Sequence, residues 1–228
     1  GEILGFAGLP DSGKDELVSA IFGLSPRNGQ IRVRGTTIKP GSPTDAIHNG
    51  MALIPADRRG SGAFLTMSVE NNTVASALDR ISQISFLRRD RIRQTSAYYV
   101  KQFDTRISSH QQKLRTLSGG NQQKVVLARG LATQPSILIL HEPTRGIDVG
   151  AKSEIYNIIQ ELAAQSVTIL IVSSELPELI GQCNRILVMF QGRITGEFSG
   201  DEATEEAILA CAMGQAQIQQ NQTRVATL

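Results

Sequence analysis

The sequence is poor in residues that build covalent and metal-bound frameworks. Its 228 residues include no tryptophan, three histidines and two cysteines. Cys183 and Cys211 are too far apart for the short ligand spacings of a zinc site. We expect both to be reduced thiols of a cytosolic protein, and the sequence argues against a disulfide-stapled scaffold.

Long apolar runs and a marked charge excess are also absent. The apolar stretches, such as Val167 to Val172, are all far shorter than the ~20 residues that span a bilayer. A net charge of +2 gives no strong electrostatic case for binding nucleic acid or an anionic membrane. No signal peptide is recognisable, and the chain begins at Gly1 with little sequence before its first motif. We therefore expect a fragment of a longer polypeptide.

Short apolar segments alternate with helical stretches at both ends of the chain. Three of them, at Ile137–Leu140, Thr168–Val172 and Arg185–Met189, are apolar almost throughout, which suits a parallel sheet buried on both faces. Together the segments indicate strands at Ile3–Ala7, Ile31–Val33, Ala52–Ile54, Ile137–Leu140, Thr168–Val172 and Arg185–Met189. Helices are expected at Lys14–Phe22, Ala151–Ala164 and Leu176–Gln182. The alternation predicts an α/β fold.

The middle of the chain, residues 66–134, has helical periodicity and no convincing strand. A stretch of this length predicts an inserted helical subdomain. We expect a core made of 1–65 and 135–214, followed by a polar, disordered tail at 215–228. The insertion carries a basic cluster, LRRDRIR at 87–93, which we interpret as a solvated helix face because no aromatic residues interleave for stacking.

A glycine-rich loop follows the first predicted strand. GLPDSGKDEL matches the phosphate-binding pattern G-x-x-x-x-G-K-[ST] at Gly8, Gly13 and Lys14, but Asp15 stands where the hydroxyl is expected. Backbone N–H groups in such a loop converge on an anion, and the following helix adds its dipole. Taken alone, the motif is equally consistent with a tight strand-to-helix turn. The candidate ATP-binding residues are Gly8, Leu9, Pro10, Asp11, Ser12, Gly13, Lys14 and Asp15.

A second block decides between these interpretations. TLSGGNQQKVVLARGLATQPSILILHEPTRGIDVG, residues 116–150, resembles the signature-to-Walker-B block of the ABC ATPase family. The resemblance implies a P-loop NTPase-like parallel sheet with an inserted signature subdomain. It assigns Glu142 as the catalytic glutamate and Asp148 as the centre of the D-loop. The signature residues are Leu117, Ser118, Gly119, Gly120 and Asn121.

The particular residues of this block indicate a subfamily. LSGGNQQK together with EPTRGIDVGAK is similar to the ATP-binding subunits of bacterial monosaccharide importers, in which two ABC halves lie in one polypeptide. The chain resembles the C-terminal half, and we expect the antiparallel strands that precede the loop in the family to be missing from this fragment. The resemblance implies ATP and Mg²⁺ as cofactors. It also implies an N-terminal ABC half, a membrane permease and, indirectly, a periplasmic sugar-binding protein as partners, with no nucleic acid. The expected location is the cytoplasmic face of the inner membrane.

Ser118 is expected to cap the helix that begins near Gly120. Its hydroxyl, the neighbouring N–H groups and the helix dipole then form an outward-facing anion site. In the family this site closes over ATP held by the opposite half, so it acts in trans.

Three positions depart from the pattern of a working ATPase, and a fourth, in the Q-loop region, lacks a polar side chain. Asp15 replaces the magnesium-binding hydroxyl, and His141 replaces the Walker B aspartate. Ser174 stands at the switch-histidine position, where it is the second candidate catalytic residue beside Glu142. Ala56 stands where the Q-loop glutamine is expected. Magnesium prefers oxygen ligands, so its binding at this half is expected to be weak or absent.

Asp15 and His141 should approach each other, because both replace groups that surround one ion. Two outcomes remain open. Asp15 could serve as the carboxylate ligand of a weakened magnesium site, or it could pair with His141 and fill the place of the ion. We favour the pair, because the aspartate side chain is longer than serine and would crowd the ion.

The sequence therefore predicts one half of an importer ATPase whose own site is degenerate and whose signature serves the partner half. The alternative is a non-catalytic half with a structural or regulatory role. A soluble ABC protein of translation or DNA repair is a third hypothesis, which the low net charge disfavours.

Overall fold

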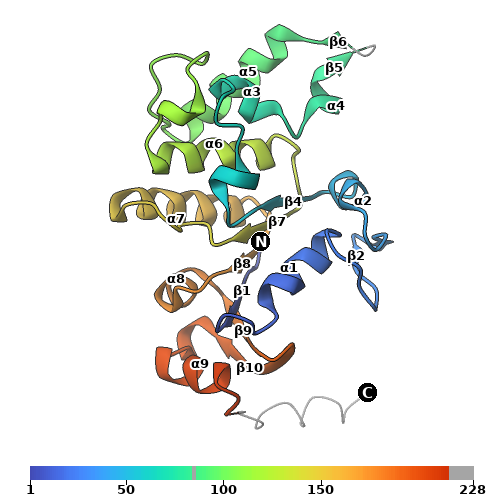
Figure 1. Cartoon of the computed structure of the whole chain (residues 1–228), viewed down its shortest axis with the longest axis vertical. Helices are drawn as coiled ribbons and strands as arrows, with labels where there is room; N and C mark the ends of the chain where they lie inside the picture. Colours follow the sequence, from blue (N-terminus) through green and yellow to red (C-terminus); the bar gives the residue numbers. More distant parts are fainter. Residues whose placement is uncertain (84–85, 216–228) are drawn as a thin grey trace.

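A six-stranded sheet forms the centre of the molecule in the computed structural model, which describes residues 1–83 and 86–215 (Figure 1). The strand order is β10-β9-β1-β8-β7-β4. The strands are β1 (Ile3–Gly8), β4 (Met51–Ile54), β7 (Ile137–His141), β8 (Thr168–Val172), β9 (Arg185–Phe190) and β10 (Arg193–Ser199). All neighbours pair in parallel except β10, which is antiparallel to β9. The predicted parallel sheet is confirmed.

Helices cover both faces of the sheet, which explains why its five parallel strands are mainly apolar. One face packs against α1 (Lys14–Phe22) and α2 (Pro43–His48). The other packs against α7 (Val149–Ala164), α8 (Leu176–Gln182) and α9 (Glu205–Ala212). In Figure 1, α1 and α2 lie to the right of the strands, and α7, α8 and α9 lie to the left.

The short elements and the edge of the sheet differ from the prediction. The strand predicted at Ile31–Val33 is present as β2 (Arg32–Val33), but it pairs with the unpredicted β3 (Thr36–Thr37) in a separate hairpin between α1 and α2 and not with the central sheet. Helix α2, with only six residues, and β10, an edge strand with one buried position among exposed and partly buried ones, were not predicted. Such short or half-exposed segments have little periodicity for a sequence pattern to show.

The segment between β4 and β7 is mainly helical. It contains α3 (Val69–Val74), α4 (Leu78–Ile81), α5 (Arg89–Gln102) and α6 (Gly119–Leu131), with a π-helical turn η1 (Arg58–Gly62) and a 3₁₀ turn η2 (Leu114–Thr116). The expectation that it holds no strand is wrong, because β5 (Ser82–Gln83) and β6 (Phe86–Leu87) form a hairpin. Two residues per strand are too few to show a period.

Only two stretches connect this helical segment to the core. The chain leaves at the carboxyl end of β4 and returns at the amino end of β7, and these strands are paired neighbours from Met51–Ile137 to Ile54–Leu140. Helix α6 packs on β4 and α7. No helix among the described residues is long and apolar enough to cross a membrane. The tail expected from residue 215 lies outside the described residues from 216 onward.

Candidate functional site

The glycine-rich loop connects β1 to α1 at the carboxyl edge of the sheet, where parallel α/β proteins bind ligands. Gly13 caps α1 in the left-handed conformation, with φ of 97°. A Cβ at this position would lie 3.0 Å from the Cα of Gly192 in the turn between β9 and β10. The Gly192 N–H also donates to the Ser12 carbonyl at 2.8 Å, so this turn fixes the loop from outside.

One polar atom of the loop has no protein partner. The Ser12 side chain is 3% exposed, and its Oγ is buried without a hydrogen bond. A Cβ on Gly8 would lie 2.4 Å from this oxygen, so any larger residue at position 8 would collide with the hydroxyl. Buried hydroxyls normally have partners, and an orphaned one at a helix N-terminus fits a ligand with acceptor oxygens, such as phosphate.

Three predicted residues meet beside the loop. Lys14 is 4% exposed, and its Nζ lies 3.6 Å from Oε1 of Glu142. Ser174 Oγ donates to Oε2 of the same glutamate at 3.2 Å. Glu142 follows β7 with a positive φ of 51°, and its N–H donates to the Val172 carbonyl at 2.7 Å. The glutamate is thus held between the lysine of the loop and the serine that follows β8.

Asp15 and His141 are in direct contact, as the sequence predicted. His141 Nε2 lies 2.9 Å from Asp15 Oδ1. The histidine side chain is 18% exposed and the aspartate side chain 58% exposed, so the pair lies at the rim of the site. Among the described residues, no group of three or more His, Cys, Asp or Glu side chains gathers as a possible metal site.

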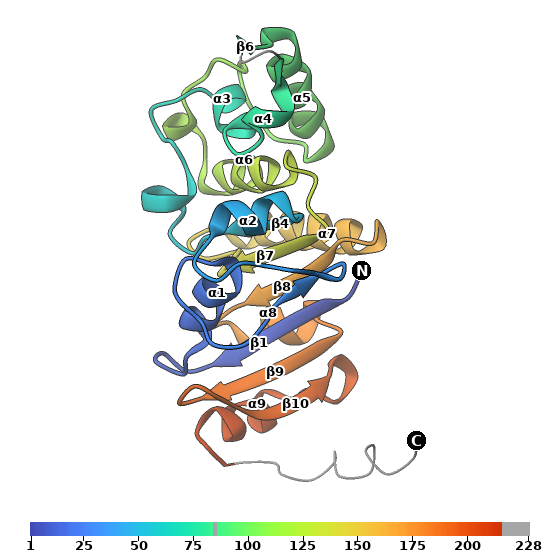
Figure 2. The same cartoon turned by 90° about the vertical axis from the view of Figure 1, so that its right-hand side faces the viewer.

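The signature residues begin α6. Ser118 is its N-cap and accepts a hydrogen bond from the Asn121 backbone at 3.4 Å, and a second from the Asn121 side chain at 2.9 Å. Gly120 faces α7 so closely that a Cβ would lie 2.5 Å from Cβ of Ala151. Leu117 is 9% exposed. Figures 1 and 2 show α6 and α1 on opposite sides of β4, so the chain does not bring its signature to its own loop.

Two other predicted residues have local roles. Asp148 caps α7, with Oδ1 accepting from the Ala151 N–H at 2.9 Å. Ala56 lies in the turn after β4, and its carbonyl accepts from the Arg58 N–H at 3.1 Å. The Arg58 side chain, which the sequence did not single out, then reaches α6: its Nη2 would be 3.3 Å from a Cβ on Gly119. Burial lowers the pKa of Arg58, with a further contribution from Arg59.

A buried carboxyl group behind the site was also missed. Glu178 on α8 is 3% exposed and accepts a hydrogen bond from Thr144 Oγ1 at 2.9 Å. Burial raises the pKa of Glu178, while hydrogen bonds from Ser173 and Thr144 oppose that rise. This carboxyl connects the segment after β7 with the segment after β8. A glutamate next to the apolar Leu179 was the one available signal in the sequence.

Comparison with known proteins identifies the class. A family profile described as ABC transporter matches residues 1–145, which is more than half of the sequence. The chain therefore belongs to the ABC transporter family.

Its curated relatives are named for sugar import. The chain is 50% identical over 216 residues to the xylose import ATP-binding protein of Moorella thermoacetica, covering 94% of this chain and 43% of the relative. It is 45% identical over 215 residues to the ribose import ATP-binding protein of Rhodococcus jostii, covering 94% and 43%. The chain thus spans less than half the length of these relatives.

Solved structures share the fold. A nucleotide-free ATP-binding cassette from an ABC transporter superposes with a TM-score of 0.76 at 21% identity, covering 92% of this chain and 84% of that structure. The ADP conformation of MJ1267, an ATP-binding cassette of an ABC transporter, gives a TM-score of 0.75 at 21% identity, covering 93% of this chain and 87% of that structure. These likenesses establish the ABC ATPase fold.

Proposed function

We propose that this chain is the C-terminal nucleotide-binding half of an importer ATPase that couples ATP binding and hydrolysis to the uptake of a monosaccharide. The observation that carries the proposal is a phosphate-binding loop and a capped signature helix in one chain, at 45–50% identity to sugar import proteins. The partners would be an N-terminal ABC half, a membrane permease and, indirectly, a periplasmic sugar-binding protein. The complex would lie on the cytoplasmic face of the inner membrane.

The nucleotide phosphates would be held by the loop and Lys14. Three features support this: the orphaned Ser12 hydroxyl, the glycine backbone and the start of α1. Lys14 would exchange its contact with Glu142 for the phosphate oxygens. When bound, ATP supplies the phosphoryl group whose transfer to water drives transport. Glu142 and Ser174 would then face the reacting end of the nucleotide.

Magnesium fits this donor set poorly, so this half would bind nucleotide weakly and hydrolyse little at its own loop. Magnesium requires several oxygen ligands in near-octahedral order. Here the carboxylate oxygen Asp15 Oδ1 already contacts an imidazole nitrogen at 2.9 Å. Imidazole is a poor ligand for this hard cation. The positive charge beside the phosphates would come from Lys14.

The signature would act in trans on nucleotide held by the partner half. Ser118, Gly119 and the start of α6 provide N–H and hydroxyl donors for phosphate oxygens. We assign residues 66–134 as the signature subdomain and 1–65 with 135–214 as the ATPase core. The subdomain and the turn at 56–62 would contact the permease.

The trans assignment can be tested in the full-length transporter by comparing substitutions in the signature and at the glutamate. Gly119→Asp should abolish sugar-stimulated ATP hydrolysis, because it places a carboxylate in the anion site. Glu142→Gln should leave most of the activity, because this half hydrolyses little. Gly181→Asp on α8 is the matched control, since a side chain there meets only open space. The assignment is reversed if Glu142→Gln abolishes turnover while Gly119→Asp does not.

The contact between Asp15 and His141 also favours a second candidate, a half that has lost nucleotide binding and acts only as a scaffold. Lys14→Ala separates the two. Unchanged transport and unchanged nucleotide binding would favour the scaffold. Loss of one bound ATP per full-length protein would favour a working phosphate loop.

A further inference from the structure

Positive charge is concentrated in one part of the helical segment. Residues 78–98 contain five arginines and two aspartates, a net charge of +3, whereas the entire chain carries +2. The rest of the chain therefore has no positive excess. The net charge of the entire chain is too small to indicate an anionic partner, because it averages over this local excess.

Most of these arginines keep their charge available. Arg88 pairs with Asp90, with Nη2 and Oδ2 2.8 Å apart. Arg80, Arg89, Arg91 and Arg93 are exposed, and none forms an ion pair within residues 1–83 and 86–215. Four unpaired guanidinium groups close together repel one another, and an anionic surface would relieve that repulsion.

Large apolar side chains are exposed beside the arginines. Phe86 and Leu87 on β6 are 77% and 51% exposed, and Phe86 is the most exposed aromatic side chain of the described residues. Leu78 and Tyr98 are 43% and 61% exposed. The basic cluster was interpreted as a solvated helix face without neighbouring aromatics. That interpretation is incomplete, because Phe86 directly precedes the cluster and Tyr98 lies on the same helix, five positions after Arg93.

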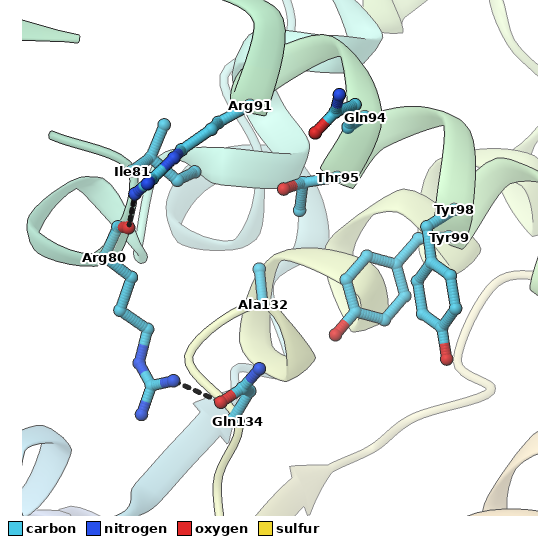
Figure 3. Close-up of a pocket in the computed structure, with 9 residues that line it drawn as sticks. All are labelled: Arg80, Ile81, Arg91, Gln94, Thr95, Tyr98, Tyr99, Ala132 and Gln134. Carbon is cyan, nitrogen blue, oxygen red and sulfur yellow. Dashed lines mark hydrogen bonds between the residues drawn. The ribbon is translucent and has the colours of Figure 1, made fainter. Parts of the chain in front are cut away.

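A cavity of about 610 Å³ opens between α4, α5 and the end of α6 (Figure 3). Arg80 and Arg91 lie on one side of it, and Tyr98 and Tyr99 lie on the other. Arg80 donates to the Gln134 side chain, and Arg91 Nη1 donates to the Arg80 carbonyl at 3.5 Å. Each guanidinium has five N–H donors, so both retain donors for an anion in the cavity.

We propose that this arginine face, defined as Leu78, Arg80, Phe86, Leu87, Arg89, Arg91, Arg93 and Tyr98, docks on the anionic phospholipid surface of a membrane. Arginine heads and exposed aromatic and leucine side chains form the combination that binds the interface of an anionic bilayer. The cavity receives the phosphate of a lipid headgroup, and Phe86 and Leu87 enter the boundary with the acyl chains. The inference rests on the proposed importer function only for placing the protein near a membrane.

The position of this face is compatible with a working ATPase. Figures 1 and 2 show β6 and α5 at the end of the molecule opposite β10 and α9. The glycine-rich loop is fixed against the turn between β9 and β10, far from that end. A membrane on the arginine face therefore leaves the loop accessible to nucleotide.

Vesicle flotation of the full-length polypeptide, without permease, tests the proposal. We expect binding to vesicles of phosphatidylcholine with phosphatidylglycerol, little binding to pure phosphatidylcholine, and weaker binding at high salt. Arg89→Gln with Arg93→Gln should weaken binding roughly 30-fold, since each arginine near an anionic surface contributes about 1 kcal/mol. Arg32→Gln with Arg193→Gln, on β2 and β10, removes the same charge elsewhere and should leave binding unchanged.

A second variant tests the apolar contribution and guards against misfolding. Phe86→Ser with Leu87→Ser changes exposed side chains only, and it should reduce the binding that remains at high salt. Equal binding to neutral and anionic vesicles would overturn the proposal, as would equal losses in the two arginine pairs. If the Arg89 and Arg93 variant loses co-purification with the permease but keeps vesicle binding, the face docks a protein and the membrane proposal is wrong. These outcomes need no ATP hydrolysis, so a failed importer assignment would appear separately, as absent sugar-stimulated turnover.

Discussion

Replacing both residues of the Asp15–His141 pair should create a magnesium site. The proposed change is Asp15→Ser with His141→Asp, which returns the hydroxyl to the loop and the carboxylate to the end of β7. In the wild type the two side chains are hydrogen-bonded to each other, with His141 Nε2 2.9 Å from Asp15 Oδ1. In the double variant, a hydroxyl and a carboxylate oxygen would instead be available to the ion, which is the type of ligand it prefers.

The size of the effect follows from exposure. The Asp15 side chain is 58% exposed, so its pairing with His141 contributes only about 0.5–1 kcal/mol to stability. Each single substitution should therefore change the free energy of unfolding little. Two unit charges 4 Å apart repel by about 1 kcal/mol in water and about 4 kcal/mol near a protein surface. Because this carboxylate is exposed, we expect a repulsion near the lower end of that range, about 1–2 kcal/mol. Asp15→Ser alone should therefore tighten ATP binding roughly 5- to 30-fold.

Titration calorimetry of the full-length protein, with the partner half unable to bind nucleotide, provides the assay. The wild type should bind ATP almost equally with magnesium and with chelator. The double variant should bind at least ten times more tightly with magnesium, a difference of about 1.4 kcal/mol. Asp11→Asn, which removes another exposed carboxylate of the loop, should leave magnesium without effect. Strongly magnesium-dependent binding by the wild type would refute the reasoning, because Asp15 would then be a working ligand.

Two further predictions concern packing and protonation. Gly120→Ala should lower the free energy of unfolding in urea by about 1–3 kcal/mol, because the new Cβ would meet Ala151 at 2.5 Å, and adding Ala151→Gly should restore most of it. A normal urea midpoint for Gly120→Ala alone would contradict this contact. Burial raises the pKa of Glu178, so the folded protein holds a proton that the unfolded chain releases. That contribution to stability is complete below the unfolded pKa and is lost as the pH rises through the folded pKa. Glu178→Gln should flatten this fall when unfolding is followed between about pH 4 and pH 8, and an unchanged slope would show that another group causes it.

The buried parts of the fold were predictable because burial on both faces produces continuous apolar runs. The bounds of α1 match the prediction, and β1, β7 and β8 each differ by at most one residue. The hairpin of β5 and β6 could not be predicted, because its pairing involves only two residues on each side. Edge strand β10 has one buried position in seven, so it produces no apolar run.

The candidate site was predictable where a residue stands at a motif position whose location in the fold is known. Asp15 and His141 were expected to meet because both occupy positions around one ion, and their contact is confirmed. The approach of Arg58 to Gly119 depends on the turn after β4, and no sequence pattern encodes it. The arginine face was missed for a similar reason. Its cavity requires Gln134, a residue 41 positions beyond Arg93 in the sequence.

The two connections of the helical segment to β4 and β7 also determine how it can move. They join opposite ends of two paired parallel strands, so the line between them runs nearly along the strand direction. A rotation of the segment about that line would change the packing of α6 on β4 and α7 without breaking a hydrogen bond of the sheet. A force applied to the segment would therefore reach the core as torque on one pair of strands. One of these strands ends at His141, so a distortion of this strand pair would also act on the contact between His141 and Asp15.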